Sequence, residues 1–443
     1  MRLARLHCIT VTDESRRMPE GLPDANLTVQ AAIPPSGKIC QNAAIIRAGT
    51  GQIYKMKRLL LSMGLMLALL PPLATAKSSP TTISYDGTRS GFEDFVDRTG
   101  LDWPIPARID TFTARDGASL RYAHWQAASP QERAGVVVFF SGRTEYIEKN
   151  IYTYRDLQSR NYDVWTLDWR GQGLSQRAIV NHPDRGHIDN FDTFVADAAQ
   201  FIDEIVELDS IQNTPKILMA HSMGGAIATL YLQSHGGQFD RAVFSAPMHG
   251  LGVDNALVRT LFSKKSAESC ATTLIGDCPW KSNFKSTRDP CNFEAPASTS
   301  MFKWKKRATI YSHDLDKLRE QFCIVEAERL GGPAGANLGL GKPTAGWMTQ
   351  AFAAIKKLFA QADMMTTPLL IIGGGEDEVV SNESQQAFCY AASAYCCRLE
   401  TPGASHELLI EIEPIREDFM DSFYSFISTE KPAPQWCAEK GSQ

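Results

Sequence analysis

A serine with a small residue two positions away on each side is the strongest sign of chemistry in this sequence. Ser222 lies in Ala220-His-Ser-Met-Gly-Gly225, after the apolar run 217–220 and before an apolar-periodic segment that starts at Met223. A strand–serine–helix turn of this kind presents the hydroxyl at the end of the strand, and its tightness requires small neighbours. The alternative is a serine that only caps a helix. Because a strand and a helix are both expected here, the pattern favours a nucleophile.

A nucleophilic serine needs a base, and that base needs an acid to orient it. In hydrolases with this turn, the order along the chain is serine, acid, histidine. Asp377 follows the buried run 369–372 and is our acid candidate, although Glu376 and Glu378 flank it. Asp254, which follows the preceding strand, is the alternative position.

His406 is the candidate base. It lies in Pro402-Gly-Ala-Ser-His-Glu407, and of the nine histidines it alone follows Asp377. His221 is too close to Ser222 in sequence to reach it. The other histidines that we considered are expected to be structural or surface residues; they are His124, His182, His187, His235, His249 and His313.

Two backbone N–H groups are expected to receive the oxyanion that forms when the serine attacks a carbonyl. One is the N–H of Met223, which follows the nucleophile. The other should come from the loop after the first long buried strand, which reads Ser141-Gly-Arg-Thr-Glu-Tyr146. Gly142 allows the backbone to turn so that the N–H of Arg143 faces Ser222. The HGGG form of this loop is absent.

Alternation of strands and helices predicts the scaffold that positions these groups. Two runs that alternate around Arg115-Asp-Gly117 indicate a β-hairpin over 109–114 and 120–125. Continuous apolar runs are typical of strands that are buried on both faces of a parallel sheet; they cover 135–140, 164–167, 217–220, 242–244 and 369–372. Helical periodicity is seen over 192–206, 223–231 and 414–427. The pattern predicts an α/β fold with a mostly parallel sheet.

The same pattern divides the chain into segments. We expect an exposed lead-in over 77–105, sheet-domain parts over 106–249 and 365–430 with a cap over 250–364 inserted between them, and a tail over 431–443. Apolar residues of the cap could form an acyl-binding wall or simply fill its core; they are Phe262, Phe302, Trp304, Trp347, Met348 and Phe352.

An apparent secretory signal lies inside the chain rather than at its start. Met56-Lys-Arg58 precedes the apolar run 59–70 and the site Ala74-Thr-Ala76, which predicts a signal peptide over 56–76 that is cleaved after Ala76. We expect residues 1–55 to be an over-extended reading frame, and the mature protein to be exported, either periplasmic or secreted. Eight of the ten cysteines follow Ala76, without the spacing of a zinc site, which indicates disulfides. The adjacent Cys396 and Cys397 should pair with different partners.

Composition and charge exclude other classes of protein. The chain has 443 residues, of which 43% are hydrophobic and 21% charged, which argues against a disordered, collagen-like or coiled-coil chain. The formal net charge is -5, and residues 1–76 carry nine basic and four acidic residues, so the rest has a charge of -10. An acidic body without basic clusters argues against a nucleic-acid partner.

Several motifs together resemble one known family. Leu167-Asp-Trp-Arg-Gly-Gln-Gly-Leu-Ser175 is similar to the D-x-R-G-x-G-x-S turn of the α/β-hydrolases. With 220–225, Arg185-Gly-His187, Ser245-Ala-Pro-Met248 and 341–347, it resembles the bacterial lysophospholipase and monoacylglycerol lipase branch, over about residues 105–428. The resemblance implies the same site: Ser222 as nucleophile, Asp377 and His406 as its partners, and the N–H groups of Arg143 and Met223 as oxyanion donors.

The sequence therefore predicts an exported serine ester hydrolase with an inserted cap on an α/β-hydrolase fold. Its expected substrate is a single-chain acyl lipid, either a lysophospholipid or a monoacylglycerol, cleaved through an acyl-enzyme. No cofactor or metal is implied, transient contact with a membrane surface is left open, and the oligomeric state is not predicted. The alternatives are a general carboxylesterase, an aminopeptidase-type peptidase on the same fold, and a secreted binding protein that does not catalyse.

Overall fold

An eight-stranded sheet with the strand order β1-β2-β4-β3-β5-β6-β7-β8 organises the chain. The computed structural model describes residues 83–179, 182–208, 211–252, 291, 311–331, 338–341 and 343–440. Strand β2 runs antiparallel to β1 and β4, and every other neighbouring pair is parallel. The predicted α/β class with a mostly parallel sheet is confirmed. The strands are β1 (Arg108–Thr113), β2 (Ser119–Trp125), β3 (Gly135–Phe140), β4 (Tyr162–Leu167), β5 (Lys216–His221), β6 (Arg241–Ser245), β7 (Leu369–Gly374) and β8 (Cys396–Thr401).

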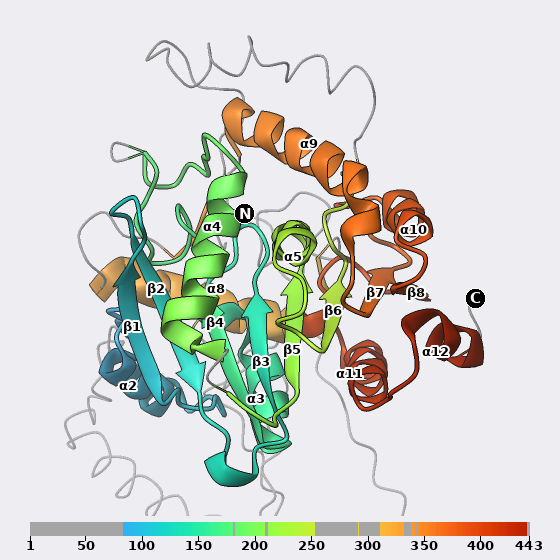
Figure 1. Ribbon diagram of the computed structural model, residues 1–443. Helices are drawn as coiled ribbons and strands as arrows, with labels where there is room; N and C mark the ends of the chain where they lie inside the picture. Colours follow the sequence, from blue (N-terminus) through green and yellow to red (C-terminus); the bar gives the residue numbers. More distant parts are fainter. Residues whose placement is uncertain are drawn as a thin grey trace, which may run out of the picture. The chain divides into compact units, whose positions relative to one another are not determined.

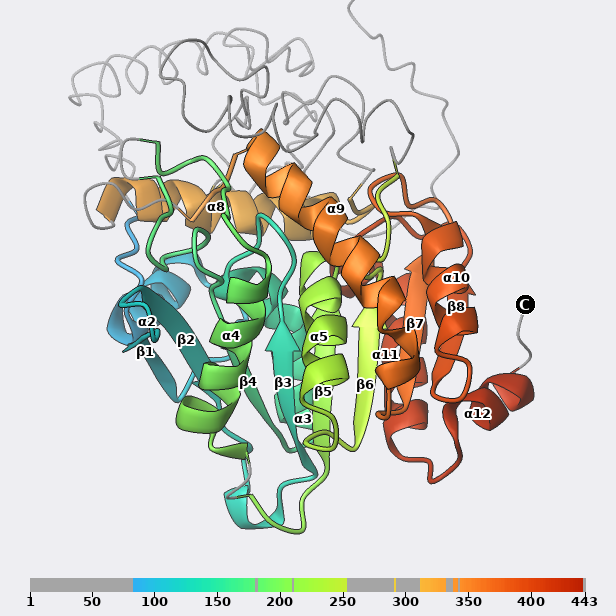
Figure 2. The ribbon, with the colours of Figure 1, turned by 45° about the horizontal axis from the view of Figure 1, so that its top comes forward.

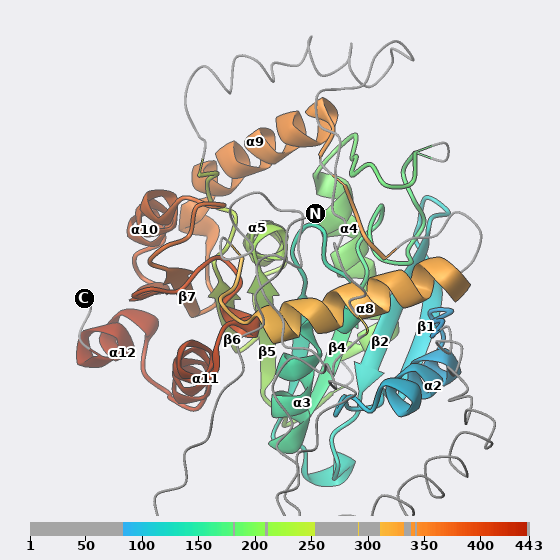
Figure 3. The same cartoon turned by 180° about the vertical axis from the view of Figure 1, so that it is seen from behind.

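Helices cover both faces of the sheet (Figure 1). Helices α4 and α5 lie in front of it in Figure 1, and the view from behind in Figure 3 shows α2, α3 and α11 on the opposite face. The helices are α2 (Arg89–Thr99), α3 (Ile151–Ser159), α4 (Asp192–Gln200), α5 (Met223–Ser234), α8 (Leu315–Gly331), α9 (Ala345–Ala360), α10 (Asn382–Ala391), α11 (Glu413–Ile427) and α12 (Ala433–Lys440). Short 3-10 segments are η1 (Pro130–Glu132), η2 (Ile147–Asn150), η7 (Ala362–Met364) and η8 (Leu408–Ile410), and the helix that starts at Asp192 ends in the π-helical turn η3 (Phe201–Val206).

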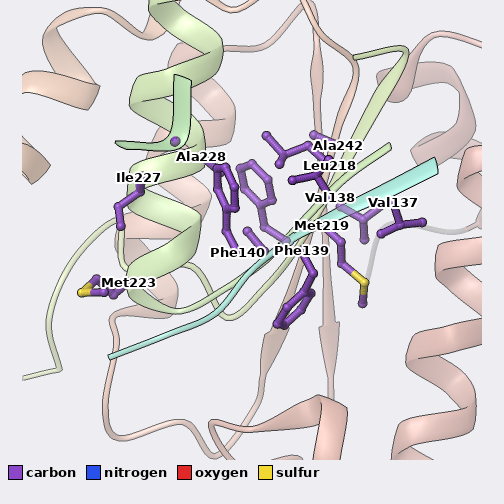
Figure 4. Packing of buried hydrophobic residues seen from close by; sticks show 14 of the residues in the cluster. Val137, Val138, Phe139, Phe140, Leu218, Met219, Met223, Ile227, Ala228 and Ala242 are labelled. Atoms are coloured by element: carbon purple, nitrogen blue, oxygen red, sulfur yellow. The ribbon is translucent and has the colours of Figure 1, made fainter. Parts of the chain in front are cut away.

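The core forms where the central strands meet α5. All six residues of β3 are buried, which explains why its sequence is a continuous apolar run rather than an alternating one. Figure 4 shows Val137–Phe140 of this strand beside Leu218 and Met219 of β5, with Ile227 and Ala228 of α5 packed nearby.

Two helices of the segment between β6 and β7 lie across the carboxyl ends of the parallel strands (Figure 2). Helix α9 contacts α5, and its N-cap Thr344 accepts a hydrogen bond from the N–H of Trp347. Tyr146 anchors helix α8, because its hydroxyl donates to the Gln321 carbonyl at 3.0 Å. The expected cap residues Phe262, Phe302 and Trp304 lie outside the described residues, as does the segment 1–82 with its expected signal peptide. None of the helices described here has a stretch both long and apolar enough to span a bilayer.

The expectation of an exposed lead-in over 77–105 is wrong for its described part. Helix α2 lies there, capped by Thr88 at its start and by Gly100 in a left-handed conformation at its end. Phe92, Phe95 and Trp103 are buried and pack on one another. The polar residues of this segment occupy the outer face of a short amphipathic helix, so its average composition concealed the buried face.

The tail over 431–443 also contains a helix, which the sequence did not lead us to expect. Helix α12 contacts β8, and the ring of its buried Trp436 meets that of Phe426 in α11 edge-on. A disulfide between Cys397 and Cys437 joins this helix to the sheet. Cys389 pairs with Cys396, and Cys291 with Cys323. The prediction that Cys396 and Cys397 have different partners is confirmed.

Removing the Cys397–Cys437 disulfide is expected to destabilise the protein more than removing the Cys389–Cys396 disulfide. The first pair is 40 residues apart and the second only 7. Closing the longer loop removes more conformational entropy from the unfolded chain, which amounts to about 4 kcal/mol against about 2 kcal/mol. Denaturant unfolding of the two double-alanine variants measures the difference. Equal losses of unfolding free energy would contradict this account.

Candidate active site

Ser222 occupies a strained turn between β5 and α5. Its φ of 52° and ψ of -118° place it in a conformation that residues with a side chain rarely adopt. The backbone is held there because the Ser222 N–H donates to the Ser245 carbonyl at 3.0 Å, and the Met248 N–H donates to the Ser222 carbonyl at 2.8 Å. A Cβ at Gly224 would lie 2.2 Å from the carbonyl oxygen of Phe140. Close packing against β3 therefore requires a glycine at position 224.

The structure brings Ser222, His406 and Asp377 into one hydrogen-bonded chain. His406 Nε2 lies 2.9 Å from Ser222 Oγ, and His406 Nδ1 lies 2.7 Å from Asp377 Oδ2. The three side chains come from the loops that follow β5, β7 and β8, which are neighbours at the same edge of the sheet. Because Asp377 accepts at Nδ1, the neutral imidazole presents Nε2 to the serine as an acceptor. The arrangement can remove a proton from Ser222.

Asp377 is distinguished from its acidic neighbours by its surroundings. Its side chain is fully buried, whereas Glu376 and Glu378 are exposed. Burial by itself would raise the pKa of Asp377, but His406 and the N–H groups of Val379 and Val380 hold it below its usual value. Asp377 therefore stays ionised beside the imidazole. The alternative acid, Asp254, lies outside the described residues.

The loop that contains Arg143, one of the two expected oxyanion donors, lies close to Ser222. A Cβ at Gly142 would lie 3.1 Å from the Ser222 Cβ, so this loop approaches the serine closely. The Gly142 N–H donates to Glu145 Oε2 at 2.6 Å, and the Thr144 N–H donates to Gln172 Oε1 at 3.1 Å. The Arg143 N–H between them, like that of Met223, has no hydrogen-bond partner among the described residues. Both are thus free to bind a substrate oxygen.

The turn after β4 supports this loop from below. Gln172 donates through Nε2 to the Gly142 carbonyl at 3.1 Å, in addition to accepting from Thr144. Asp168 accepts from the N–H groups of Ile147 and Leu174, both at 2.8 Å. The D-x-R-G-x-G-x-S turn thereby holds the loop over 141–146, which contains the expected oxyanion donor, at both of its ends.

A sequence profile of the family described as "Serine aminopeptidase, S33" matches residues 131–413. This match covers more than half of the chain and includes every residue of the hydrogen-bonded chain described above. The protein belongs to the serine aminopeptidase S33 family. It is a serine hydrolase of the α/β-hydrolase fold.

Two relatives are similar to this chain over most of their length. Lysophospholipase L2 of Escherichia coli (strain K12) is 27% identical over 328 residues, which cover 72% of this chain and 86% of the relative. The probable lysophospholipase L2 of Haemophilus influenzae is 26% identical over 302 residues, with coverages of 67% and 84%.

Solved structures share the fold at lower identity. Monoglyceride lipase from Saccharomyces cerevisiae has a TM-score of 0.53 at 15% identity, covering 74% of this chain and 96% of that one. A carboxyl esterase from Bacillus coagulans also has a TM-score of 0.53 at 15% identity, with coverages of 72% and 97%. At this identity the likeness concerns the fold alone.

Next to the triad, this S33 family member buries a charged cluster that our sequence reasoning missed. Lys149 donates to Glu145 Oε1 at 2.8 Å and to Glu407 Oε1 at 2.6 Å. Glu145 also accepts a hydrogen bond from the Gly142 N–H, and Glu407 directly follows His406 in sequence. The cluster therefore joins the loop over 141–146 to the loop that contains His406. Glu145 and Glu407 both lie in segments that the sequence analysis singled out, 141–146 and 402–407. No feature of those segments indicated that a lysine would join the two carboxylates.

The two carboxylates of this cluster have pKa values that are shifted in opposite directions. Burial would raise the pKa of Glu145, but the ammonium of Lys149, His221 and the Gly142 N–H lower it to about 2. Burial raises the pKa of Glu407, one of whose oxygens has no partner among the described residues. Burial also lowers the pKa of His221 to about 3, so its imidazole is neutral. Glu145, His221 and Glu407 could by position hold a metal ion, but Lys149 already supplies the positive charge there.

Replacing Lys149 with methionine is expected to reduce the free energy of unfolding by about 3–5 kcal/mol at neutral pH, because two buried carboxylates lose their cation. Both would then have folded-state pKa values above their unfolded ones. A raised carboxylate pKa costs stability as the pH rises, so the deficit should shrink on acidification. Urea unfolding at several pH values tests this. Lys431→Met, at an exposed pair with Glu439, is the matched control and should cost less than about 1 kcal/mol. A pH-independent deficit would refute the role of the charge.

Proposed function

We propose that this S33 family hydrolase cleaves the ester bond of a single-chain acyl lipid, a lysophospholipid or a monoacylglycerol. The observation that carries the proposal is the hydrogen-bonded chain from Ser222 through His406 to Asp377. The similarity to two lysophospholipases over two thirds of the chain supports a lipid ester as the substrate.

In the proposed reaction, His406 Nε2 accepts the proton of Ser222 as the serine oxygen attacks the ester carbonyl. Asp377 fixes the tautomer and stabilises the imidazolium. The N–H groups of Arg143 and Met223 bind the tetrahedral oxyanion, each contributing about 3 kcal/mol. His406 then protonates the departing glyceryl oxygen, and water, activated by the same histidine, releases the fatty acid from the acyl-enzyme.

Export is part of the proposal. Disulfides form and persist in oxidising compartments and are rare in the cytosol. Three disulfides among the described residues, together with the signal-like segment over 56–76, support a periplasmic or secreted enzyme.

The test is fatty-acid release by the purified, oxidised protein from a lysophospholipid, a monoacylglycerol, a short-chain ester and a peptide amide. We expect release from at least one of the two lipids, blocked by a fluorophosphonate. Activity on the short ester alone would indicate a general esterase rather than a lipid hydrolase. Cleavage of the peptide alone would make the protein a peptidase. Inactivity on all four, without fluorophosphonate labelling, would favour a binding protein.

A further inference from the structure

The side chain of Arg143 extends from the oxyanion loop toward the segment that precedes α9. Its Nη2 donates to the carbonyl of Gly341, and its guanidinium carbon lies 5.2 Å from the ring centroid of Trp347. Gly186 leaves room for it, because a Cβ at that position would lie 2.8 Å from Nη2. The guanidinium is therefore held in one place, between the loop that contains Gly186 and the chain that enters α9.

Within the described part of the chain, every partner of this guanidinium is uncharged. No carboxylate in the described part of the chain forms an ion pair with Arg143. The nearest acid in sequence, Glu145, is already matched by Lys149. The contrast is Arg121, which is more deeply buried and is paired with Glu148 and Asp168. A cation removed from water without a counter-charge is costly, and proteins usually avoid it.

The hydrogen-bond donors of Arg143 are also incompletely used. Among the described residues, Nε is buried without a hydrogen-bond partner, and only Nη2 makes a bond. Burial lowers the pKa of Arg143 to about 10, which still leaves it charged at neutral pH. An arginine with spare donors and no counter-charge can bind a planar or tetrahedral oxyanion through two N–H groups.

The location of this charge bears on the substrate. The backbone N–H of the same residue is the proposed oxyanion donor, so the guanidinium lies within one side chain's length of the reacting ester. In a lysophospholipid, the glycerol carbons separate the ester from a phosphodiester by a few bonds. In a monoacylglycerol, a neutral hydroxyl occupies that position. Only the first substrate offers a negative charge to this guanidinium.

We propose that the guanidinium of Arg143 binds the phosphodiester of a lysophospholipid and so makes this anionic group the preferred headgroup over the neutral glycerol of a monoacylglycerol. The inference rests on the proposed function and specifies its substrate. Arg143 then has two roles: its backbone N–H binds the oxyanion, and its side chain determines specificity.

The test compares kcat/KM for octanoyl lysophosphatidylcholine and octanoylglycerol, both in monomeric solution, with the full-length protein. We expect the wild type to prefer the phospholipid. Arg143→Met should lower the ratio of the two kcat/KM values by about 10- to 100-fold, the effect of one charge-assisted pair of hydrogen bonds. Arg143→Lys keeps the charge but not the paired N–H groups of the guanidinium, so its ratio should lie between those of the wild type and Arg143→Met. Arg108→Met, at an exposed arginine of β1, removes the same charge elsewhere and should leave the ratio unchanged.

Product inhibition of the wild type tests the same site without a variant. Glycerophosphocholine should compete with substrate more strongly than glycerol or inorganic phosphate at equal ionic strength. An unchanged ratio in Arg143→Met would overturn the inference, and so would equal inhibition by inorganic phosphate, which would indicate a site for free anions. In both cases lipid hydrolysis and labelling of the serine would persist. If the wild type showed neither lipid hydrolysis nor labelling of the serine, the proposed function would be refuted, and the inference with it.

Discussion

Replacing Ser222 with alanine is expected to lower kcat by about 10⁴- to 10⁶-fold and to abolish labelling by a fluorophosphonate. Ser222 Oγ is the atom that His406 Nε2 contacts at 2.9 Å, so the substitution removes the group that attacks the ester and accepts the label. The remaining activity should come from the oxyanion donors and from substrate binding alone, because these do not depend on the hydroxyl.

The same substitution should leave the fold intact. Alanine keeps the Cβ of Ser222 and the backbone hydrogen bonds that fix its unusual conformation, so the free energy of unfolding should change by less than about 1 kcal/mol. Circular dichroism and urea unfolding check this beside the kinetics. Thr229→Ala, a hydroxyl on α5 that bonds the Gly225 carbonyl, is a control that should retain labelling. Labelling of Ser222→Ala at the wild-type rate would place the nucleophile elsewhere.

The residues of the hydrogen-bonded chain could be proposed from the sequence because Ser222 and Asp377 each follow a predicted strand, and His406 is the one histidine after Asp377. The apolar runs before Ser222 and Asp377 coincide with β5 and β7, and parallel strands end at the same edge of a sheet. Their separation in sequence, 184 residues between Ser222 and His406, is therefore bridged by topology rather than by any local signal. Chain order and strand ends are enough to bring them together.

The charged cluster behind the triad could not be found in that way. Lys149 and Glu407 are 258 residues apart, and neither stands at a position that the strand pattern marks. A buried ion pair depends on which side chains two loops happen to bring together and on the burial that excludes water. Sequence composition reports neither. The same reason explains why Arg143 could be proposed for its backbone N–H but not for its guanidinium, whose partners lie in the segment before α9.

Helix α2 was missed for a different reason, because the sequence does contain the signals of a helix there. Thr88 and Gly100 are typical helix caps, and Phe92 and Phe95 share one face. What the sequence lacked was the surface that buries this face: Tyr85 bonds through its N–H to the Ala327 carbonyl of α8, more than two hundred residues away. A short amphipathic helix is recognised as part of the core only when its partner is known.

Asp377→Asn is expected to lower kcat by about 10⁴-fold while leaving KM nearly unchanged. In the wild type, the carboxylate accepts the Nδ1–H of His406 at 2.7 Å, which leaves Nε2 free to accept the serine proton. The asparagine amide can donate to Nδ1 instead, which favours the tautomer that carries its proton on Nε2. That tautomer cannot accept a proton from Ser222. The size and shape of the site are preserved, so substrate binding should survive.

The control is the neighbouring carboxylate. Glu376→Gln makes the same chemical change one residue away, at an exposed side chain, and should alter kcat by less than about twofold. If the acid were Glu376 instead, the two results would be exchanged. A moderate loss in both variants would mean that the loop as a whole, rather than one carboxylate, orients the imidazole. The buried position of Asp377 and its bonds to the N–H groups of Val379 and Val380 argue for a single acid, because they fix the carboxylate that faces His406.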